Sequence, residues 1–227
     1  MDKRVVTRFA LRESVDVLFT GIALFWSAGD IHWWQAWALL ALDSAWIIAT
    51  ATVILRNHPD LLAERLGPRK GAKRWDTALM SGHGILQIAV LIVAGLDHRY
   101  GWTAAIPASA QVAALLAAAL GYALVVWATA SNPFFTLIVR IQTDRGHSVV
   151  SAGPYARVRH PAYAGGLLPI VFVPVLLGSA WALLLGSIDA LLMILRTALE
   201  DRTLKAELPG YPEYALRVRY RLLPDVW

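Results

Sequence analysis

Residues 162–195 read AYAGGLLPIVFVPVLLGSAWALLLGSIDALLMIL, an apolar stretch of 34 residues in which Asp189 is the only charged side chain. A helix needs about 20 apolar residues to cross the hydrocarbon core of a bilayer, so this stretch is too long for one crossing and barely long enough for two. Gly178-Ser179-Ala180 interrupts it near its middle. We therefore predict a tight helical hairpin with arms of about 16 residues, the first kinked by Pro169 and Pro174.

The composition of the whole chain agrees with an integral membrane protein. Its 227 residues are 57% hydrophobic, and the mean hydropathy is +0.52, which is too apolar for an ordinary soluble domain. We expect a single domain over 1–227 with an all-α polytopic fold of five to six transmembrane helices. The chain has no cysteine, which excludes disulfides, thiol nucleophiles and thiolate metal ligands, and we expect no metal.

Apolar segments upstream of the hairpin predict the other membrane spans. Three of them are clear: Trp33–Leu55, which opens with an interfacial tryptophan belt, about Thr77–Leu96, and Ala108–Ala130. The first apolar run, Val15–Ala28, is short and follows a basic tail, as in signal peptides and in first transmembrane helices. We favour a helix that tilts, thins the bilayer or begins inside the basic tail.

Polar segments connect these spans and follow the hairpin. We predict a short amphipathic helix over Pro59–Leu66, an interfacial segment over Asn132–Gln142, continuation of the second hairpin arm to about Lys205, a turn at Leu208–Pro212, and a basic amphipathic segment over Glu213–Arg221. Under this topology every Lys and Arg residue except Arg99, out of 21, falls on one side of the membrane. The positive-inside rule then predicts cytoplasmic termini, and we expect the protein in the plasma (inner) membrane.

Asp43 lies near the middle of the second predicted span. An acid at this depth is a candidate functional residue, but we favour a buried group that a neighbouring helix satisfies. We expect His83 or Gln87 of the third span, which are one helical turn apart, to be its partner. The net charge of +5 does not indicate a nucleic-acid partner, because the basic residues lie between apolar segments.

The loop before the hairpin, residues 146–166, reads GHSVVSAGPYARVRHPAYAGG. Histidines, arginines and tyrosines stand here among prolines and glycines at a membrane surface, a composition typical of loops that cradle a ligand. The alternative is a loop whose arginines only fix the topology. By its position the loop is cytoplasmic, where a nucleotide-derived cofactor is available.

An ordered series of residues connects this loop with the second hairpin arm. The series His147, Gly153-x-Tyr155 and Arg159-His160-Pro161-x-Tyr163-x-Gly165, followed by Glu200-Asp201, resembles the isoprenylcysteine carboxyl methyltransferase family, whose wider relatives include phospholipid methyltransferases. The resemblance covers roughly the last two fifths of the chain, from Asn132 onward. In that family the acidic pair is usually two glutamates, and here the second residue is Asp201.

The resemblance implies a membrane methyltransferase that uses S-adenosylmethionine. Residues 132–227 would form the cofactor-binding and catalytic portion, preceded by transmembrane helices in 1–131. The residues that it implies for cofactor binding are His147, Gly153, Pro154, Tyr155, His160, Pro161, Tyr163, Glu200 and Asp201. Glu200 would hold the methionine amino group, while the loop's backbone amides, His160 and Tyr163 would serve as donors. The two arginines matched to the family, Arg159 and Arg196, would orient a carboxylate acceptor as the catalytic residues.

The spacing of Asp189, Met193, Arg196 and Glu200 places these four residues on one face of a helix. A simple Arg196–Glu200 ion pair at the membrane surface is the alternative reading of this stripe. We expect carboxyl methylation of a lipophilic, isoprenylcysteine-like acceptor, with membrane lipids as the other partners. Phospholipid N-methylation ranks second, and a small transporter or membrane scaffold is the non-enzymatic alternative.

Overall fold

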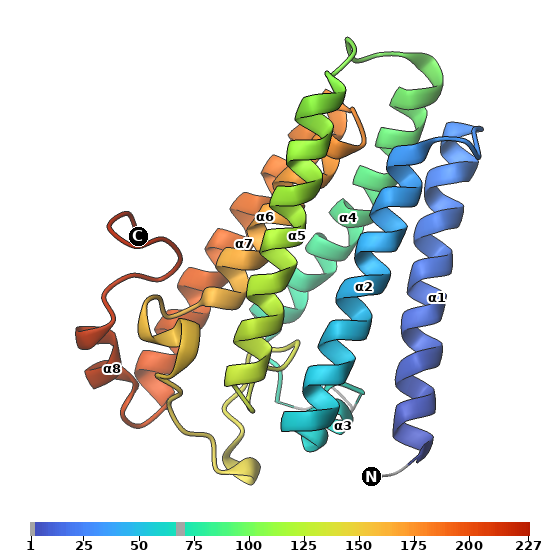
Figure 1. The fold of residues 1–227 in the computed structure, drawn as a ribbon. Coiled ribbons are helices and arrows are strands. Elements are labelled where there is room, and N and C mark those ends of the chain that lie inside the picture. The colour runs from blue at the N-terminus through green and yellow to red at the C-terminus, as the bar shows by residue number, and fades with distance from the viewer. Residues whose placement is uncertain (1–2, 67–70) are drawn as a thin grey trace.

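The structure, a computed structural model, describes residues 3–66 and 71–227. Within these residues the chain forms eight α-helices and no strand (Figure 1). The helices are α1 (Lys3–Ala28), α2 (Trp34–Asn57), α3 (Pro59–Leu66), α4 (Arg74–Tyr100), α5 (Ala108–Ser131), α6 (Pro161–Leu176), α7 (Ala180–Glu207) and α8 (Tyr211–Arg217). Helices α2, α4, α5 and α7 are long and apolar enough to cross a membrane, and α6 is a shorter apolar helix. The predicted all-α polytopic class is confirmed.

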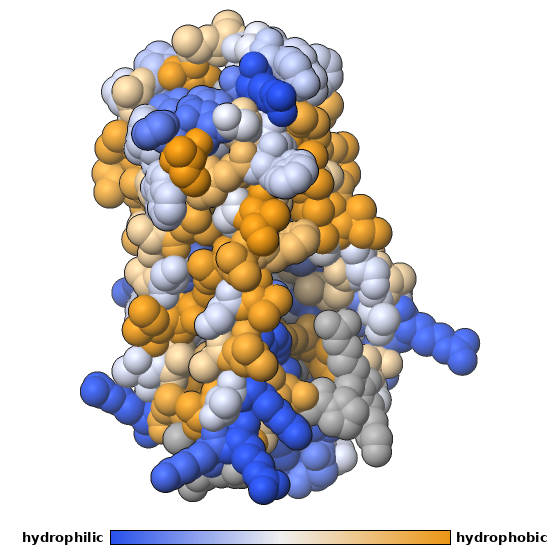
Figure 2. Space-filling view, turned by 90° about the vertical axis from the view of Figure 1, so that its right-hand side faces the viewer, coloured by the Kyte–Doolittle hydropathy of each residue, from blue (hydrophilic) through white to orange (hydrophobic). Residues whose placement is uncertain are grey.

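Six helices form a closed ring. Each packs against two neighbours, in the order α1, α2, α5, α6, α7, α4 and back to α1. Figure 1 shows these helices side by side, with α3, α8 and the long loop after α5 at the end that carries the N-terminus. Apolar side chains cover the middle of the bundle and hydrophilic ones gather toward its two ends, as expected for a bundle surrounded by lipid (Figure 2).

Helix α1 begins at Lys3, twelve residues before the predicted start at Val15. Three explanations were predicted for the short apolar run: a tilted helix, a thinned bilayer, or a helix that begins inside the basic tail. The structure shows the third. Its 26 residues measure about 39 Å at 1.5 Å per residue, enough to follow α2 along the bundle. The basic residues Arg69 and Lys70, which entered the charge count, lie outside the described residues.

The predicted hairpin is confirmed, although its arms are unequal: α6 has 16 residues and α7 has 28. The turn lies at Gly178, whose φ of 78° suits glycine, and at Ser179, whose hydroxyl accepts a hydrogen bond from the Ala182 amide at 3.0 Å. Pro169 and Pro174 lie inside α6 as expected. Helix α7 runs past Arg196 to Glu207, and this extension carries the site residues out of the apolar region.

The predicted partner of Asp43 is wrong. Tyr122 of α5 donates to the Asp43 carboxylate at 2.9 Å. His83 and Gln87 instead contact Asp189 of α7, at 2.9 and 2.6 Å. The physical reason is the order of the ring, in which α2 packs against α5 while α4 packs against α7.

The polar segments follow the prediction in part. Helix α3 has the predicted bounds and buries Leu61 and Leu62 against α1 and α2. The final helix, α8, is Tyr211–Arg217 rather than Glu213–Arg221. It starts earlier because Tyr211 and Tyr214 are the residues that it buries, next to Leu208.

Candidate active site

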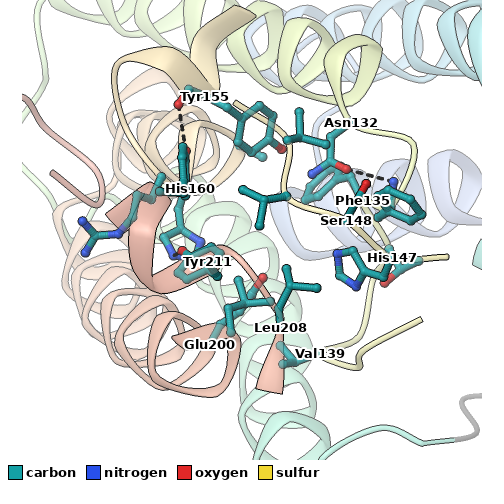
Figure 3. Close-up of a pocket in the computed structure, with 18 of the residues that line it drawn as sticks. Asn132, Phe135, Val139, His147, Ser148, Tyr155, His160, Glu200, Leu208 and Tyr211 are labelled. Carbon is teal, nitrogen blue, oxygen red and sulfur yellow. Dashed lines mark hydrogen bonds between the residues drawn. The ribbon is translucent and has the colours of Figure 1, made fainter. Parts of the chain in front are cut away.

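A pocket of about 720 Å³, counted to its open mouth, lies where the long loop meets α7 and α8. One wall comes from residues 132–150, the other from residues 155–163 with the end of α7 and α8. Figure 3 shows His147 and Glu200 on opposite sides of this space, with Tyr155 and His160 along the rim between them. All three chain segments that carry the predicted cofactor residues therefore line one pocket, and the segment with His147 faces the other two.

A chain of hydrogen bonds runs from Glu200 into the protein. The Tyr163 hydroxyl donates to the Glu200 carboxylate, and the Arg196 guanidinium donates to the Tyr163 oxygen. Behind them, Arg196 Nε donates to Asp76 at 2.7 Å and its third nitrogen donates to the Leu137 carbonyl at 3.2 Å. Both ends of this series of hydrogen bonds are carboxylates. Arg196 therefore contacts the buried Asp76 directly and Glu200 of the pocket through the Tyr163 hydroxyl.

Asp76 is the site residue that our sequence analysis missed. Its side chain is fully buried, and its second oxygen accepts from the Val139 amide at 2.8 Å. Asp76 thereby holds the 137–139 segment, a wall of the pocket, against α4. The available signal was an acid in the first turn of a membrane helix, shortly after the basic residues Lys73 and Arg74.

The predicted face of α7 is confirmed for Asp189, Met193 and Arg196, all of which are buried. The alternative of a direct Arg196–Glu200 ion pair is not what the structure has. Arg196 pairs with Asp76, and Tyr163 stands between Arg196 and Glu200. The stripe is thus an interhelical network and not a surface pair.

Arg159 and Asp201 form a second, separate network. Arg159 donates two bonds to Asp201, at 2.7 and 3.2 Å, and two bonds to the carbonyls of Val218 and Arg219. Asp201 is 1% exposed and also accepts from Tyr211 at 3.0 Å. Every nitrogen of Arg159 is therefore bonded to the protein itself, although the side chain lies at the pocket wall.

The backbone donors predicted for the loop are partly occupied. The Arg159 and His160 amides donate to the carbonyls of Tyr220 and Arg221, both at 2.9 Å, so they are not open to an anionic ligand. The imidazole of His160 lies 3.3 Å from the Tyr211 hydroxyl and stacks on Tyr163 at 5.8 Å. This ring therefore borders the pocket with its position set by two tyrosines.

His147 lies on the opposite wall. Its Nδ1 accepts from the Gln142 amide at 3.3 Å, and its ring packs on Phe134 at 4.6 Å. Burial, with help from Arg140 and Arg145, lowers the pKa of His147 below its ordinary 6.5. The imidazole is therefore neutral near pH 7 and keeps Nδ1 as an acceptor.

Gly153, Pro154, Tyr155 and Pro161 shape the loop. Gly153 has φ of 59°, and a Cβ there would lie 2.5 Å from the Ser131 hydroxyl, so only glycine lets the loop approach the end of α5 this closely. Pro154 and Tyr155 lie in a one-turn 3₁₀ helix, and Pro161 opens α6. The Tyr155 carbonyl accepts from Tyr214 at 2.7 Å, which ties α8 to this turn (Figure 3).

Residues 112–206 match the model of the isoprenylcysteine carboxyl methyltransferase (ICMT) family. The match covers less than half of the chain. It contains both arginines, Tyr163 and the Glu200-Asp201 pair, so the resemblance predicted from these residues is confirmed. Together with the four apolar helices, this match supports an integral membrane protein that is similar to the ICMT-family methyltransferases. A comparison with curated proteins gave no match.

Proposed function

We propose that the protein transfers a methyl group from S-adenosylmethionine to the carboxylate of a lipophilic, isoprenylcysteine-like acceptor at the cytoplasmic face of the plasma (inner) membrane. The observation that carries this proposal is the Glu200 carboxylate, which faces the pocket of the ICMT-family segment and is held there by Tyr163. A cofactor with an ammonium group and an adenine ring needs such a carboxylate beside apolar walls.

The pocket residues fit S-adenosylmethionine. Glu200 would accept from the methionine ammonium group, while Phe134 and Phe135 offer flat apolar surface for the adenine ring. Neutral His147 and the neighbouring backbone supply hydrogen-bonding groups without adding charge near a sulfonium. When bound, the cofactor supplies an activated methyl group that leaves by in-line displacement and needs no metal.

A carboxylate acceptor suits this surrounding better than an amine does. Carboxylates are ionised and nucleophilic at neutral pH, whereas an amine must first lose a proton. Positioning and exclusion of water are then the protein's main contributions. We retain Arg196 as the predicted acceptor ligand, which requires the acceptor carboxylate to take over one of its present contacts. Arg159 is enclosed by Asp201 and the C-terminal segment, and we assign it to positioning.

Entry of the acceptor from the bilayer is supported by the exposed apolar residues next to Arg196. Leu195, which directly precedes Arg196 in α7, is 50% exposed, and Leu137, whose carbonyl contacts Arg196, is 43% exposed. In a bundle surrounded by lipid, exposed apolar side chains such as these two leucines face the lipid. We infer that the lipid tail of the acceptor lies along these side chains while its carboxylate reaches the Arg196–Tyr163 pair.

The proposal is tested on purified full-length protein in lipid nanodiscs. Calorimetry without added metal is expected to show binding of S-adenosylmethionine and S-adenosylhomocysteine at micromolar concentrations. Release of S-adenosylhomocysteine is then compared for a prenylcysteine-like acid, phosphatidylethanolamine and a short soluble acid, and we expect the prenylated acid to react best. Preference for phosphatidylethanolamine would replace carboxyl methylation by headgroup N-methylation. Absence of cofactor binding, together with activity in a transport assay, would exclude the proposed methyltransferase function and favour a transporter.

A further inference from the structure

The C-terminal segment Val218–Trp227, here called the strap, is bonded to the motif loop through its main chain. Carbonyls of four successive strap residues, 218 to 221, accept hydrogen bonds from Arg159 or from the backbone amide of His160, at 2.6 to 2.9 Å. The strap closes on itself, because the amides of Arg221 and Leu222 donate to the Trp227 carbonyl at 2.7 and 3.0 Å. It thus acts as one folded unit laid against the loop.

Asp201 joins the strap to the helix that carries Glu200. Its buried carboxylate contacts Arg159 of the loop, Tyr211 of α8 and, at 3.0 Å, Nε of Arg221 in the strap. Lys205, one turn further along α7, reaches the same carboxylate at 2.9 Å with a side chain that is 40% exposed. The carboxylate of Asp201, the residue directly after Glu200, is thus contacted by side chains from four segments: Arg159, Tyr211, Arg221 and Lys205.

The same residues shape the cofactor pocket. Arg159, His160 and Tyr211, all within reach of Asp201, line the pocket next to Glu200. Arg221 contacts Asp201 from outside this lining, and its guanidinium lies over the Trp227 ring at 4.7 Å. A displacement of the strap would therefore free Arg159 and His160 and alter one wall of the pocket without removing any group that faces it.

We propose that Asp201 is a positioning residue which couples closure of the strap to cofactor binding, so that the pocket is complete only while Arg221 is held. This inference rests on the proposed function, since it concerns the same pocket. Reciprocity follows from linkage: if a closed strap favours the cofactor, the bound cofactor must favour a closed strap by the same factor. Asp201 then acts through Arg159, His160 and Tyr211 and not by contact with the cofactor.

The test compares Arg221→Gln with Lys205→Gln in the full-length protein in nanodiscs. Both variants remove one cation from the same oxygen of Asp201, but only the first comes from the strap. Strap release is measured as the rate of trypsin cleavage after Arg219, whose carbonyl must leave Arg159 before the bond can be cut. Cofactor affinity is measured by calorimetry with S-adenosylhomocysteine.

We expect Arg221→Gln to speed cleavage and to weaken S-adenosylhomocysteine binding, each by about 5- to 20-fold, while Lys205→Gln stays within about twofold on both. Saturating S-adenosylhomocysteine should slow cleavage of the unchanged protein, which a merely structural contact would not do. Faster cleavage with unaltered affinity, or equal effects of the two variants, would overturn the coupling. Absence of binding by the unchanged protein would instead overturn the proposed function. The same two measurements on folded Asp201→Asn protein should show both faster cleavage and weaker S-adenosylhomocysteine binding.

Discussion

At the scale of single residues, α7 carries two glutamates that can be compared, Glu200 as the test residue and Glu207 as its control. Glu200 faces the pocket and accepts from Tyr163, whereas Glu207 bonds Lys73 at the surface with 43% of its side chain exposed. We expect Glu200→Gln to weaken S-adenosylmethionine binding by about 10- to 100-fold, because a hydrogen bond to a charged group contributes roughly 1.5–3 kcal/mol.

Glu207→Gln, the control, should leave cofactor affinity within about twofold, since an exposed ion pair contributes little. Calorimetry on both variants in the same lipid gives the comparison. Equal affinities for the two would mean that another group holds the ammonium of the cofactor, and Glu200 would lose its assigned role.

Arg196 is a less suitable residue for such a test, for a reason that lies in its partner. Its pairing with Asp76 is buried on both sides, at 4% and 0% exposure. Removing one member of a buried ion pair leaves the other charge uncompensated and costs about 3–5 kcal/mol. Loss of activity in Arg196→Ala would therefore report folding as much as the acceptor contact. Arg196→Lys retains the charge and separates the two effects better.

At the scale of helices, α5 and α6 make their closest approach at two glycines. A Cβ on Gly165 would lie 2.6 Å from the Gly121 carbonyl of α5, while a Cβ on the adjacent Gly166 would meet nothing within 4 Å. Small residues at such a crossing let the two backbones pack closely. This contact also sets where α6, and with it Tyr163, begins relative to α5.

We predict opposite effects of alanine at these neighbouring positions. Gly165→Ala should destabilise the protein by about 1–3 kcal/mol through overpacking against backbone. Gly166→Ala should be neutral or stabilising by up to about 1 kcal/mol, because alanine is the better helix former. Thermal unfolding in one detergent measures both. A Gly165→Ala protein as stable as Gly166→Ala would show that the helices separate at this point without cost.

The prediction for the whole molecule concerns its orientation in the membrane. The N-terminus, α3, α8 and the pocket loop share one end of the bundle, and the α4–α5 connection lies at the other (Figure 1). Because the chain has no cysteine, single cysteines can be introduced without background. We expect Ala105→Cys in the α4–α5 connection to react with an impermeant thiol reagent added outside intact cells, and Thr143→Cys to react only after lysis.

The orientation follows from charge, since almost all basic residues belong to the pocket end under the predicted topology. Labelling of Thr143→Cys and protection of Ala105→Cys in intact cells would reverse it. A reversed orientation would also place the pocket away from cytoplasmic S-adenosylmethionine, so this measurement bears on the proposed function as well.

The sequence alone determined the membrane class, the hairpin with its turn at Gly178, the short helix from Pro59, and the resemblance to the ICMT family. The first three depend on local composition and periodicity, which a window of about 20 residues contains. The resemblance depends on the identities of spaced residues from His147 to Asp201. The start of α1 was misplaced because charged residues mask a helix when only apolar length is counted. Helix α8 was shifted because its start depends on which tyrosines are buried.

Only the tertiary structure decided which groups become partners. The order of helices around the ring paired Asp43 with Tyr122, Asp189 with His83, and Arg196 with Asp76, 120 residues away. No periodicity along one helix carries that information, because ion pairs and hydrogen bonds between helices depend on which faces meet. For the same reason the sequence could place Arg159 and Asp201 near the site, whereas only the folded chain shows that they bind each other and the strap.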